Sequence, residues 1–176
     1  LPKKCNDPQT KSGLPGQNEI RISEQFMTSK SFKAQFELNR SADELFPLFS
    51  AEGETLWVPG WDYIAVSAGK ELHEDYVFLT ENHDYATTNA IWLVKKHEPD
   101  NYFVQFYKVE PEDKIAVVSV KCEVVSKSRT QVTVGYEYIA LSDKGRDFIS
   151  DHSDEDYVAF IGEWKILLEM YFEDKD

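Results

Sequence analysis

The segment from residue 57 to residue 63 carries the side chains best suited to hold a small molecule. Trp57 and Trp61 flank the Pro59-Gly60 turn, and Tyr63 follows two residues later. Tryptophan offers a large apolar face and a single N–H donor, so two of them beside a turn are suited to gripping an apolar or amphipathic ligand. The alternative is that both indoles only fasten this segment to the rest of the fold.

Other aromatic side chains fall on faces that we expect to point inward. Because a buried tyrosine hydroxyl needs a hydrogen-bond partner, several inward tyrosines predict a polar feature, such as ordered water or a ligand oxygen. The alternative is an ordinary aromatic core. The candidate ligand-pocket residues are Trp57, Trp61, Tyr63, Tyr76, Phe78, Trp92, Tyr136, Tyr138, Tyr157, Phe160 and Trp164.

No set of residues forms a recognisable catalytic or metal-binding motif. His83-Asp84 could act as an acid/base pair, but an exposed pair on the surface is the simpler interpretation. His152 stands among acidic residues that could hold a divalent cation, yet acids at a helix start need no metal. Cys5 and Cys122 lack zinc-site spacing, and no glycine-rich phosphate loop or G-x-S-x-G segment is present. We therefore expect no metal and no cofactor, and the catalytic residues, if any, stay unknown.

The charge balance limits the classes of partner. The chain has 19 basic and 32 acidic residues, a net charge of −13, which disfavours binding to nucleic acid and to anionic membrane surfaces. No apolar run reaches the roughly 20 residues that span a bilayer, and no signal peptide is visible. We expect a cytoplasmic protein.

Period-two alternation predicts most of the elements. Residues 1–19 are expected to be a flexible leader, and residues 20–176 a single domain that opens with an edge strand near Ile20 and Ile22. Strands are predicted at 31–38, 62–67, 76–80, 85–96, 101–109, 114–125 and 131–141. A capping box from Ser41 to Glu44 starts a short helix that Pro47 limits, and a second short helix or turn follows. In 101–109 both faces are apolar, so the inward set is either Phe103 and Tyr107 or Tyr102, Val104 and Phe106.

The last element is a long helix with one broad apolar stripe. Ser153 caps it, and three acids follow in its first turn, where they suit the helix dipole. Its apolar residues, spaced by three and four, are Tyr157, Phe160, Ile161, Trp164, Leu167, Leu168 and Tyr171. A one-faced antiparallel sheet must cover its apolar face, so we predict an α+β fold in which about six to seven strands curve around this helix.

This order of elements resembles the START-like helix-grip superfamily, also called SRPBCC or birch-pollen-allergen-like, which includes polyketide cyclase/dehydrase-like proteins. The resemblance covers about residues 32–172. Its most specific stretch is Phe46-Pro47-Leu48-Phe49, then Glu52-Gly53-Glu54, then Trp57-Val58-Pro59-Gly60-Trp61-Asp62, which is similar to a segment of small bacterial members. The resemblance implies a deep pocket for lipids, polyketides or other apolar molecules. It carries no catalytic motif onto this sequence.

Three functions follow as hypotheses. The first is binding, or transport, of a small apolar or amphipathic ligand between sheet and helix. The second is a cyclase, dehydratase or hydrolase that uses a pocket Tyr, His or Asp as acid/base, so the sequence leaves open whether the protein is an enzyme. The third is a structural module, such as a homodimer formed through an edge strand.

Overall fold

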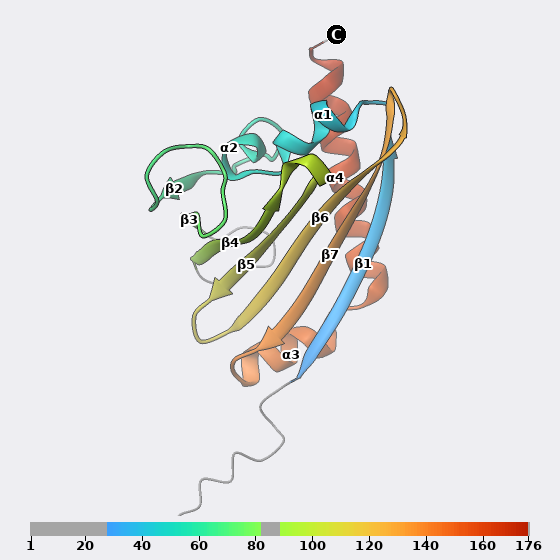
Figure 1. Ribbon diagram of the computed structural model, residues 1–176. Helices are drawn as coiled ribbons and strands as arrows, with labels where there is room; N and C mark the ends of the chain where they lie inside the picture. The colour runs from blue at the N-terminus through green and yellow to red at the C-terminus, as the bar shows by residue number, and fades with distance from the viewer. Residues whose placement is uncertain (1–27, 82–88, 176) are drawn as a thin grey trace, which may run out of the picture.

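A seven-stranded antiparallel sheet forms one layer of the computed structural model, which describes residues 28–81 and 89–175 (Figure 1). The strands follow one another across the sheet in the order β1-β7-β6-β5-β4-β3-β2. They are β1 (Ser29–Leu38), β2 (Tyr63–Ala65), β3 (Val77–Thr80), β4 (Ala90–Glu98), β5 (Phe103–Glu110), β6 (Lys114–Ser126) and β7 (Arg129–Ala140). From β2 to β7, each strand pairs with the strand that follows it in the sequence, and β7 also pairs with β1.

The helices occupy two connections and the C-terminus. Between β1 and β2 lie α1 (Ala42–Leu45), the 3-10 turn η2 (Phe46–Leu48) and α2 (Ala51–Glu54), and a second 3-10 turn, η3 (Pro99–Asn101), joins β4 to β5. After β7 come α3 (Asp143–Asp151) and α4 (Asp154–Glu173). The expected capping boxes are present: Ser41 with Glu44 opens α1, and Ser153 with Asp156 opens α4.

Helix α4 lies along the concave side of the sheet, as Figure 1 shows. Its stripe residues Tyr157, Phe160, Ile161, Trp164 and Leu168 are buried together with the inward side chains of the strands. The predicted fold class is therefore confirmed: an α+β helix-grip arrangement with short helices after the first strand. Among the described residues, no helix is both long and apolar enough to cross a membrane.

Two glycines permit close backbone approaches that hold the connections in place. A Cβ at Gly53 in α2 would come within 2.2 Å of the Pro47 carbonyl oxygen. A Cβ at Gly145 in α3 would come within 2.1 Å of the Asp113 carbonyl oxygen, where α3 crosses the β5–β6 turn. Any larger residue would push these segments apart, which explains the glycine of the Glu52-Gly53-Glu54 stretch.

Some predicted boundaries differ from those observed. The sequence suggests only a short turn, capped by Ser142 and including Gly145, before the last helix, whereas the structure has the nine-residue helix α3 there, with Ser142 as its cap and Ile149 buried. The strand expected at 62–67 has only three residues in strand geometry. The leader, the edge strand near Ile20 and Ile22, and the start of the strand predicted at 85–96 lie outside the described residues.

Candidate ligand-binding site

The space between the sheet and α4 forms a chamber with walls of aromatic and aliphatic side chains. Strands β3 to β7 supply one wall, α4 supplies Trp164, and the segment after α1 closes one side. The residues that line the chamber are Ala51, Glu54, Trp61, Phe78, Trp92, Phe106, Val118, Val120, Tyr136 and Trp164. In β5 the inward set is therefore the one with Val104 and Phe106, both buried, and the alternative left open by the sequence is settled.

Side chains fill this chamber. Its free volume is about 10 Å³, which is no more than the room that one water molecule needs. The rings of Phe78 and Trp92 stack at 5.5 Å between centroids, and Trp61 and Phe106 meet Trp92 edge-on at 5.9 and 5.8 Å. The space between sheet and helix is thus closed in this structure, because these rings interdigitate across it.

Both indoles of the predicted gripping segment are anchored to the backbone of the short helices. Trp57 Nε1 donates to the Leu48 carbonyl oxygen at 2.9 Å, and Trp61 Nε1 donates to the Ala51 carbonyl oxygen at 2.9 Å. Trp57 packs edge-on against Trp164 of α4 at 5.5 Å. These tryptophans therefore fasten the segment, as the alternative interpretation of the sequence held, while Trp61 also forms part of the chamber wall.

A cleft of about 700 Å³ lies on the other side of that wall. It opens at the ends of β2, β3 and β4. Its lining combines aliphatic carbon with hydroxyl, amide and carboxylate groups and consists of Gly60, Asp62, Tyr63, Ile64, Leu79, Thr80, Glu81, Asn89, Ala90, Ile91 and Pro111. Several of these residues alternate in sequence with chamber residues such as Trp61, Phe78 and Trp92. The same short backbone segments therefore contribute to the lining of both spaces.

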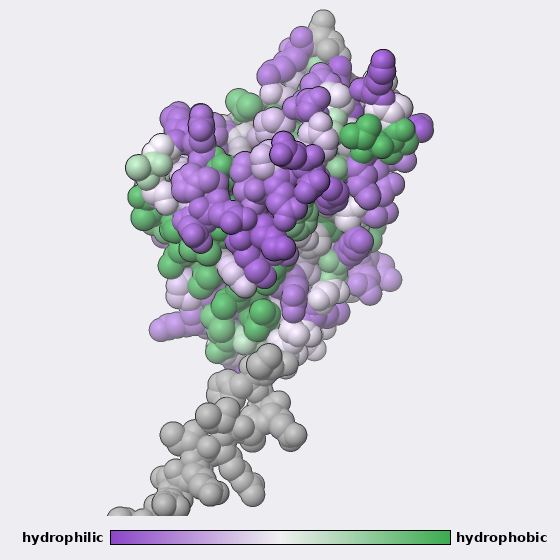
Figure 2. All heavy atoms as spheres, in the orientation of Figure 1, coloured by the Kyte–Doolittle hydropathy of each residue, from purple (hydrophilic) through white to green (hydrophobic). Residues whose placement is uncertain are grey.

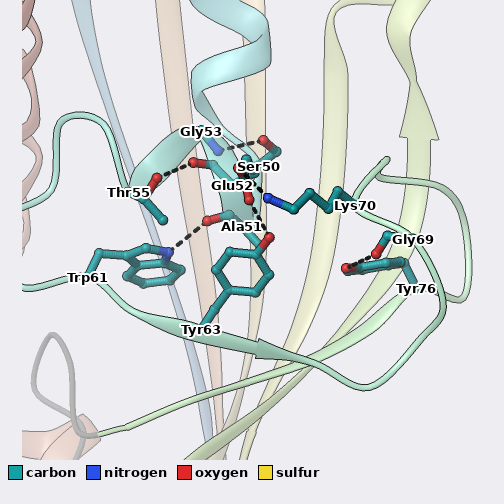
Figure 3. Close-up of polar contacts among 10 residues, drawn as sticks. All are labelled: Ser50, Ala51, Glu52, Gly53, Thr55, Trp61, Tyr63, Gly69, Lys70 and Tyr76. Carbon is teal, nitrogen blue, oxygen red and sulfur yellow. Dashed lines mark hydrogen bonds and ion pairs between the residues drawn. The ribbon is translucent and has the colours of Figure 1, made fainter.

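A hydrogen-bonded triad ties the start of β2 to α2 beside the cleft (Figure 3). The Tyr63 hydroxyl donates to Glu52 Oε2 at 2.5 Å, and Lys70 Nζ donates to Glu52 Oε1 at 3.1 Å. The two donors lower the pKa of the Glu52 carboxyl, with the Tyr63 bond as the larger cause. The neighbouring carboxylate in turn raises the pKa of Tyr63 to about 12.

The pKa of Tyr63 supplies a direct test of this triad. Alkaline ultraviolet titration is expected to show a tyrosine that ionises near pH 12, and Glu52→Gln should return it toward the ordinary value of about 10. Because the folded pKa is raised, the stability from this bond is complete below about pH 10 and is lost as pH rises through about 12. Tyr63→Phe is the control, since it removes the titrating group; a Glu52→Gln profile identical to wild type would contradict the assignment.

A cluster of buried charged side chains lies on the inner face of the sheet, next to the cleft. Thr80 and Ala90 of the cleft are paired in register, and Glu110 lies beside Ala90 on β5, paired with Lys114 of β6. Lys114 Nζ lies 2.6 Å from Glu110 Oε2, and both side chains are 2% exposed or less. This places a carboxylate and an ammonium inside the fold, one strand away from the cleft.

Two more charged residues complete this cluster and attach it to α3. Lys108 Nζ lies 3.9 Å from Glu110 Oε1, and Asp113 Oδ2 lies 3.4 Å from Lys114 Nζ. Lys144 of α3 reaches Asp113 Oδ2 at 3.5 Å. The cluster therefore joins the β5–β6 turn to α3.

Burial holds several ionisable groups near the core in uncharged forms. It raises the pKa of the Cys122 thiol to about 12 and also raises the pKa of the Tyr157 hydroxyl. It lowers the pKa of the His152 and His97 imidazoles. Such shifts disfavour a thiolate, a phenolate or an imidazolium. Among the described residues, no group of three or more His, Cys, Asp and Glu side chains is arranged to hold a metal ion.

Solved structures with the same architecture belong to several proteins. Norcoclaurine synthase from Thalictrum flavum, in complex with dopamine and hydroxybenzaldehyde, superposes with a TM-score of 0.61 at 12% identity, covering 92% of this chain and 98% of that one. The major latex-like protein 151 from Panax ginseng gives a TM-score of 0.62 at 16% identity, covering 81% and 97%. Ara h 8.0201 gives 0.59 at 11% identity, covering 82% and 95%. The chain has the birch-pollen-allergen-like helix-grip fold. No protein-family model and no curated protein matches the sequence.

The helix-grip fold brings some of the predicted pocket residues together and separates others. Trp61, Phe78, Trp92, Tyr136 and Trp164 line the chamber, and Tyr63 lines the cleft. The other five lie in the surrounding aromatic core and line neither space; they are Trp57, Tyr76, Tyr138, Tyr157 and Phe160. Whether any of the eleven binds a ligand stays a prediction.

Two of the buried tyrosine hydroxyls have backbone carbonyl partners rather than a ligand. The buried Tyr157 hydroxyl donates to the Val134 carbonyl oxygen, and the Tyr76 hydroxyl donates to the Gly69 carbonyl oxygen, both at 3.0 Å. Sequence reasoning offers Phe106 only in one of two alternative inward sets and misses Val118 and Val120 as chamber residues, although the alternation in β6 places both valines on one face. It also missed the polar lining of the cleft, for which no pattern in the sequence gives a signal.

Proposed function

We propose that this protein binds a small amphipathic molecule, with its polar part in the cleft and its apolar part in the chamber. The observation that carries this proposal is the juxtaposition of the two spaces across a single wall. The cleft volume of about 700 Å³ falls within the range of about 300–1,000 Å³ typical of small-molecule sites. The chamber beyond it offers aromatic surfaces, which bind apolar groups.

Entry requires the ring of Trp61 to move. Trp61 follows Gly60, which has a φ of +72°, and precedes the three-residue strand β2, so it sits between short elements. Its indole is held by the hydrogen bond to Ala51 and by the edge-on contact with Trp92. A ligand that replaces this apolar contact would recover about 25 cal/mol for each Å² of apolar surface it buries, which offsets the displacement.

Three further observations support a site for a small, largely apolar molecule. Among the described chamber residues, the titratable groups are the Glu54 carboxyl and the Tyr136 hydroxyl, with no imidazole, thiol or amine. The neighbouring Cys122 and Tyr157 are kept protonated by burial. Norcoclaurine synthase, which shares the fold, holds dopamine and hydroxybenzaldehyde in one of its crystal structures, so this architecture accommodates small aromatic molecules elsewhere.

The test uses the neutral apolar fluorophore N-phenyl-1-naphthylamine. Wild-type protein is expected to enhance its emission and to lose tryptophan fluorescence through energy transfer. Val118→Phe places a ring in the space that movement of Trp61 would open to the ligand, so binding should fall by about tenfold or more, the equivalent of about 1.4 kcal/mol. Trp61→Ala removes the closing ring, so binding should become tighter.

Val158→Phe provides the matched control, because Val158 is 57% exposed on the outer face of α4. This variant should bind the fluorophore like wild type. Equal binding by wild type, Val118→Phe and Trp61→Ala, with thermal unfolding showing that all three are folded, would refute the chamber as the site.

A further inference from the structure

The outward face of the sheet carries a continuous line of aliphatic side chains. Register pairs connect one outward residue on each of six strands, and every one of the six is Ile, Leu or Val. This first outer row, read from the β2 edge, is Ile64, Leu79, Ile91, Val109, Ile115 and Ile139. An antiparallel sheet with one solvated face normally places polar residues there, so six aliphatic residues in register need a reason.

A second line runs parallel to the first. The second outer row is Val77, Leu93, Tyr107 and Val117, and it continues into Glu137. None of these apolar residues packs against the core, whose members lie on the opposite face. Ile64 and Ile91 are 61% and 40% exposed, respectively. Figure 2, which views this face, shows hydrophobic side chains gathered along its lower left, below a hydrophilic band.

Two further rows form the hydrophilic band, which carries little net charge. The third outer row is Lys96, Gln105, Ser119, Gly135 and Lys33, and the fourth is Glu98, Phe103, Lys121, Thr133 and Gln35. Together with Glu137 of the second row and Lys95, which lies over Tyr107, the charged residues from the second row to the fourth are Lys33, Lys95, Lys96, Lys121, Glu98 and Glu137. Four lysines and two glutamates give the face a small positive charge, whereas the whole chain carries −13. Two copies that approach through this face therefore meet little of the repulsion that the acidic remainder of the surface would produce.

We propose that the outward face of the sheet is the contact surface of a homodimer, with a second copy of this chain as its occupant. The four rows span roughly 600 Å² in projection, from a strand spacing of about 4.8 Å and about 6.7 Å between rows. Because side chains stand up from the sheet, the accessible area is larger than this projection, which approaches the roughly 800 Å² per partner of a stable interface. Two sheet faces pack about 10 Å apart with apolar side chains between them. A two-fold axis brings the same rows of both copies together, with the band as a polar rim.

Sedimentation velocity of the full chain tests this, and the expected result is a reversible dimer. Val109→Lys and Ile115→Lys place an ammonium in the middle of the first outer row in both copies, so each should weaken dimerisation by about 100-fold or more. Ile166→Lys is the control, since Ile166 is 57% exposed on the outer face of α4, and it should dimerise like wild type. Lysine is accommodated on a solvated sheet face, so all three monomers should unfold at similar temperatures.

The effect of salt on affinity distinguishes a homodimer from binding to a partner of opposite charge. Added salt screens the repulsion between two copies of −13, so it should tighten the dimer. A wild-type monomer at every concentration would overturn the proposal, as would a dimer that only Ile166→Lys disrupts. Co-sedimentation of a monomer with phosphatidylglycerol vesicles, lost on Ile115→Lys, would assign the face to a membrane instead.

The proposed dimer face overlaps the proposed ligand site, but different residues test the two proposals. Ile64, Leu79 and Ile91 also line the cleft, but Val109 and Ile115 do not. Val109→Lys and Ile115→Lys should therefore bind N-phenyl-1-naphthylamine like wild type even when they no longer dimerise, and failure of either proposal leaves the other testable.

Discussion

Replacing Glu110 with alanine is expected to lower the free energy of unfolding by about 3–5 kcal/mol. The carboxylate lies 2.6 Å from Lys114 Nζ in a place where the Glu110 side chain is 1% exposed and that of Lys114 2%. Without it, Lys114 keeps Asp113 at 3.4 Å, but the ammonium loses its closest counter-charge inside the fold. The large cost comes from leaving one charge buried without its partner. The intact pair itself contributes little net stability compared with apolar groups of the same size.

Urea denaturation with matched variants separates this effect from the simple loss of a side chain. The double variant Glu110→Leu/Lys114→Met removes both charges and keeps the volume, so it should regain part of the stability, while Lys108 and Asp113 each lose one counter-charge. Glu169→Ala breaks the exposed Lys165–Glu169 pair, which is 3.7 Å long, and should change stability by less than about 1 kcal/mol. A Glu110→Ala protein within about 1 kcal/mol of wild type would show that the pair is solvated or dispensable.

This ionic pair also marks a limit of prediction from the sequence. Alternation in 114–125 and 131–141 placed Val118, Cys122 and Val134 inward, and all three are buried. The same alternation puts Lys114 on the inner face with Ala116, but a charged residue at a strand end is ordinarily read as solvent-exposed. Only the tertiary fold, which brings Glu110 opposite Lys114 and lays α3 over both, shows that they are buried.

The middle strands illustrate a second limit. In 101–109 the alternation failed to choose a face because Tyr107 and Val109, which point outward, are as apolar as the inward Val104 and Phe106. The outer rows that obscured this pattern are the ones proposed to bind a second copy. The segment whose inward face the sequence does not reveal thus lies on the surface proposed to bind a second copy, where apolar residues are needed for a contact outside the monomer's own core.

The sequence does not predict the free volume of the chamber, for a different reason. The sequence supplied the aromatic residues, and five of those predicted do line the chamber. Whether they enclose a pocket or fill it depends on side-chain rotamers, such as those that stack Trp92 on Phe78 and set Trp61 against it. A rotation of one indole changes the cavity by more than the volume of a water molecule, and no periodicity encodes it.

Replacing Trp164 with alanine is expected to destabilise the protein by about 3–5 kcal/mol, because it removes the side chain through which α4 contacts both the chamber and its closing segment. Trp164 is 8% exposed and meets Trp57 edge-on at 5.5 Å, Phe160 at 5.8 Å and Phe49 at 6.3 Å. Ile166→Ala is the control two residues along the helix, where the side chain is 57% exposed, and it should stay within about 0.5 kcal/mol of wild type. Urea denaturation of the pair reports which face of α4 the sheet grips. Equal stabilities would mean that the stripe from Tyr157 to Tyr171 does not face the concave side, and the chamber would lose its wall.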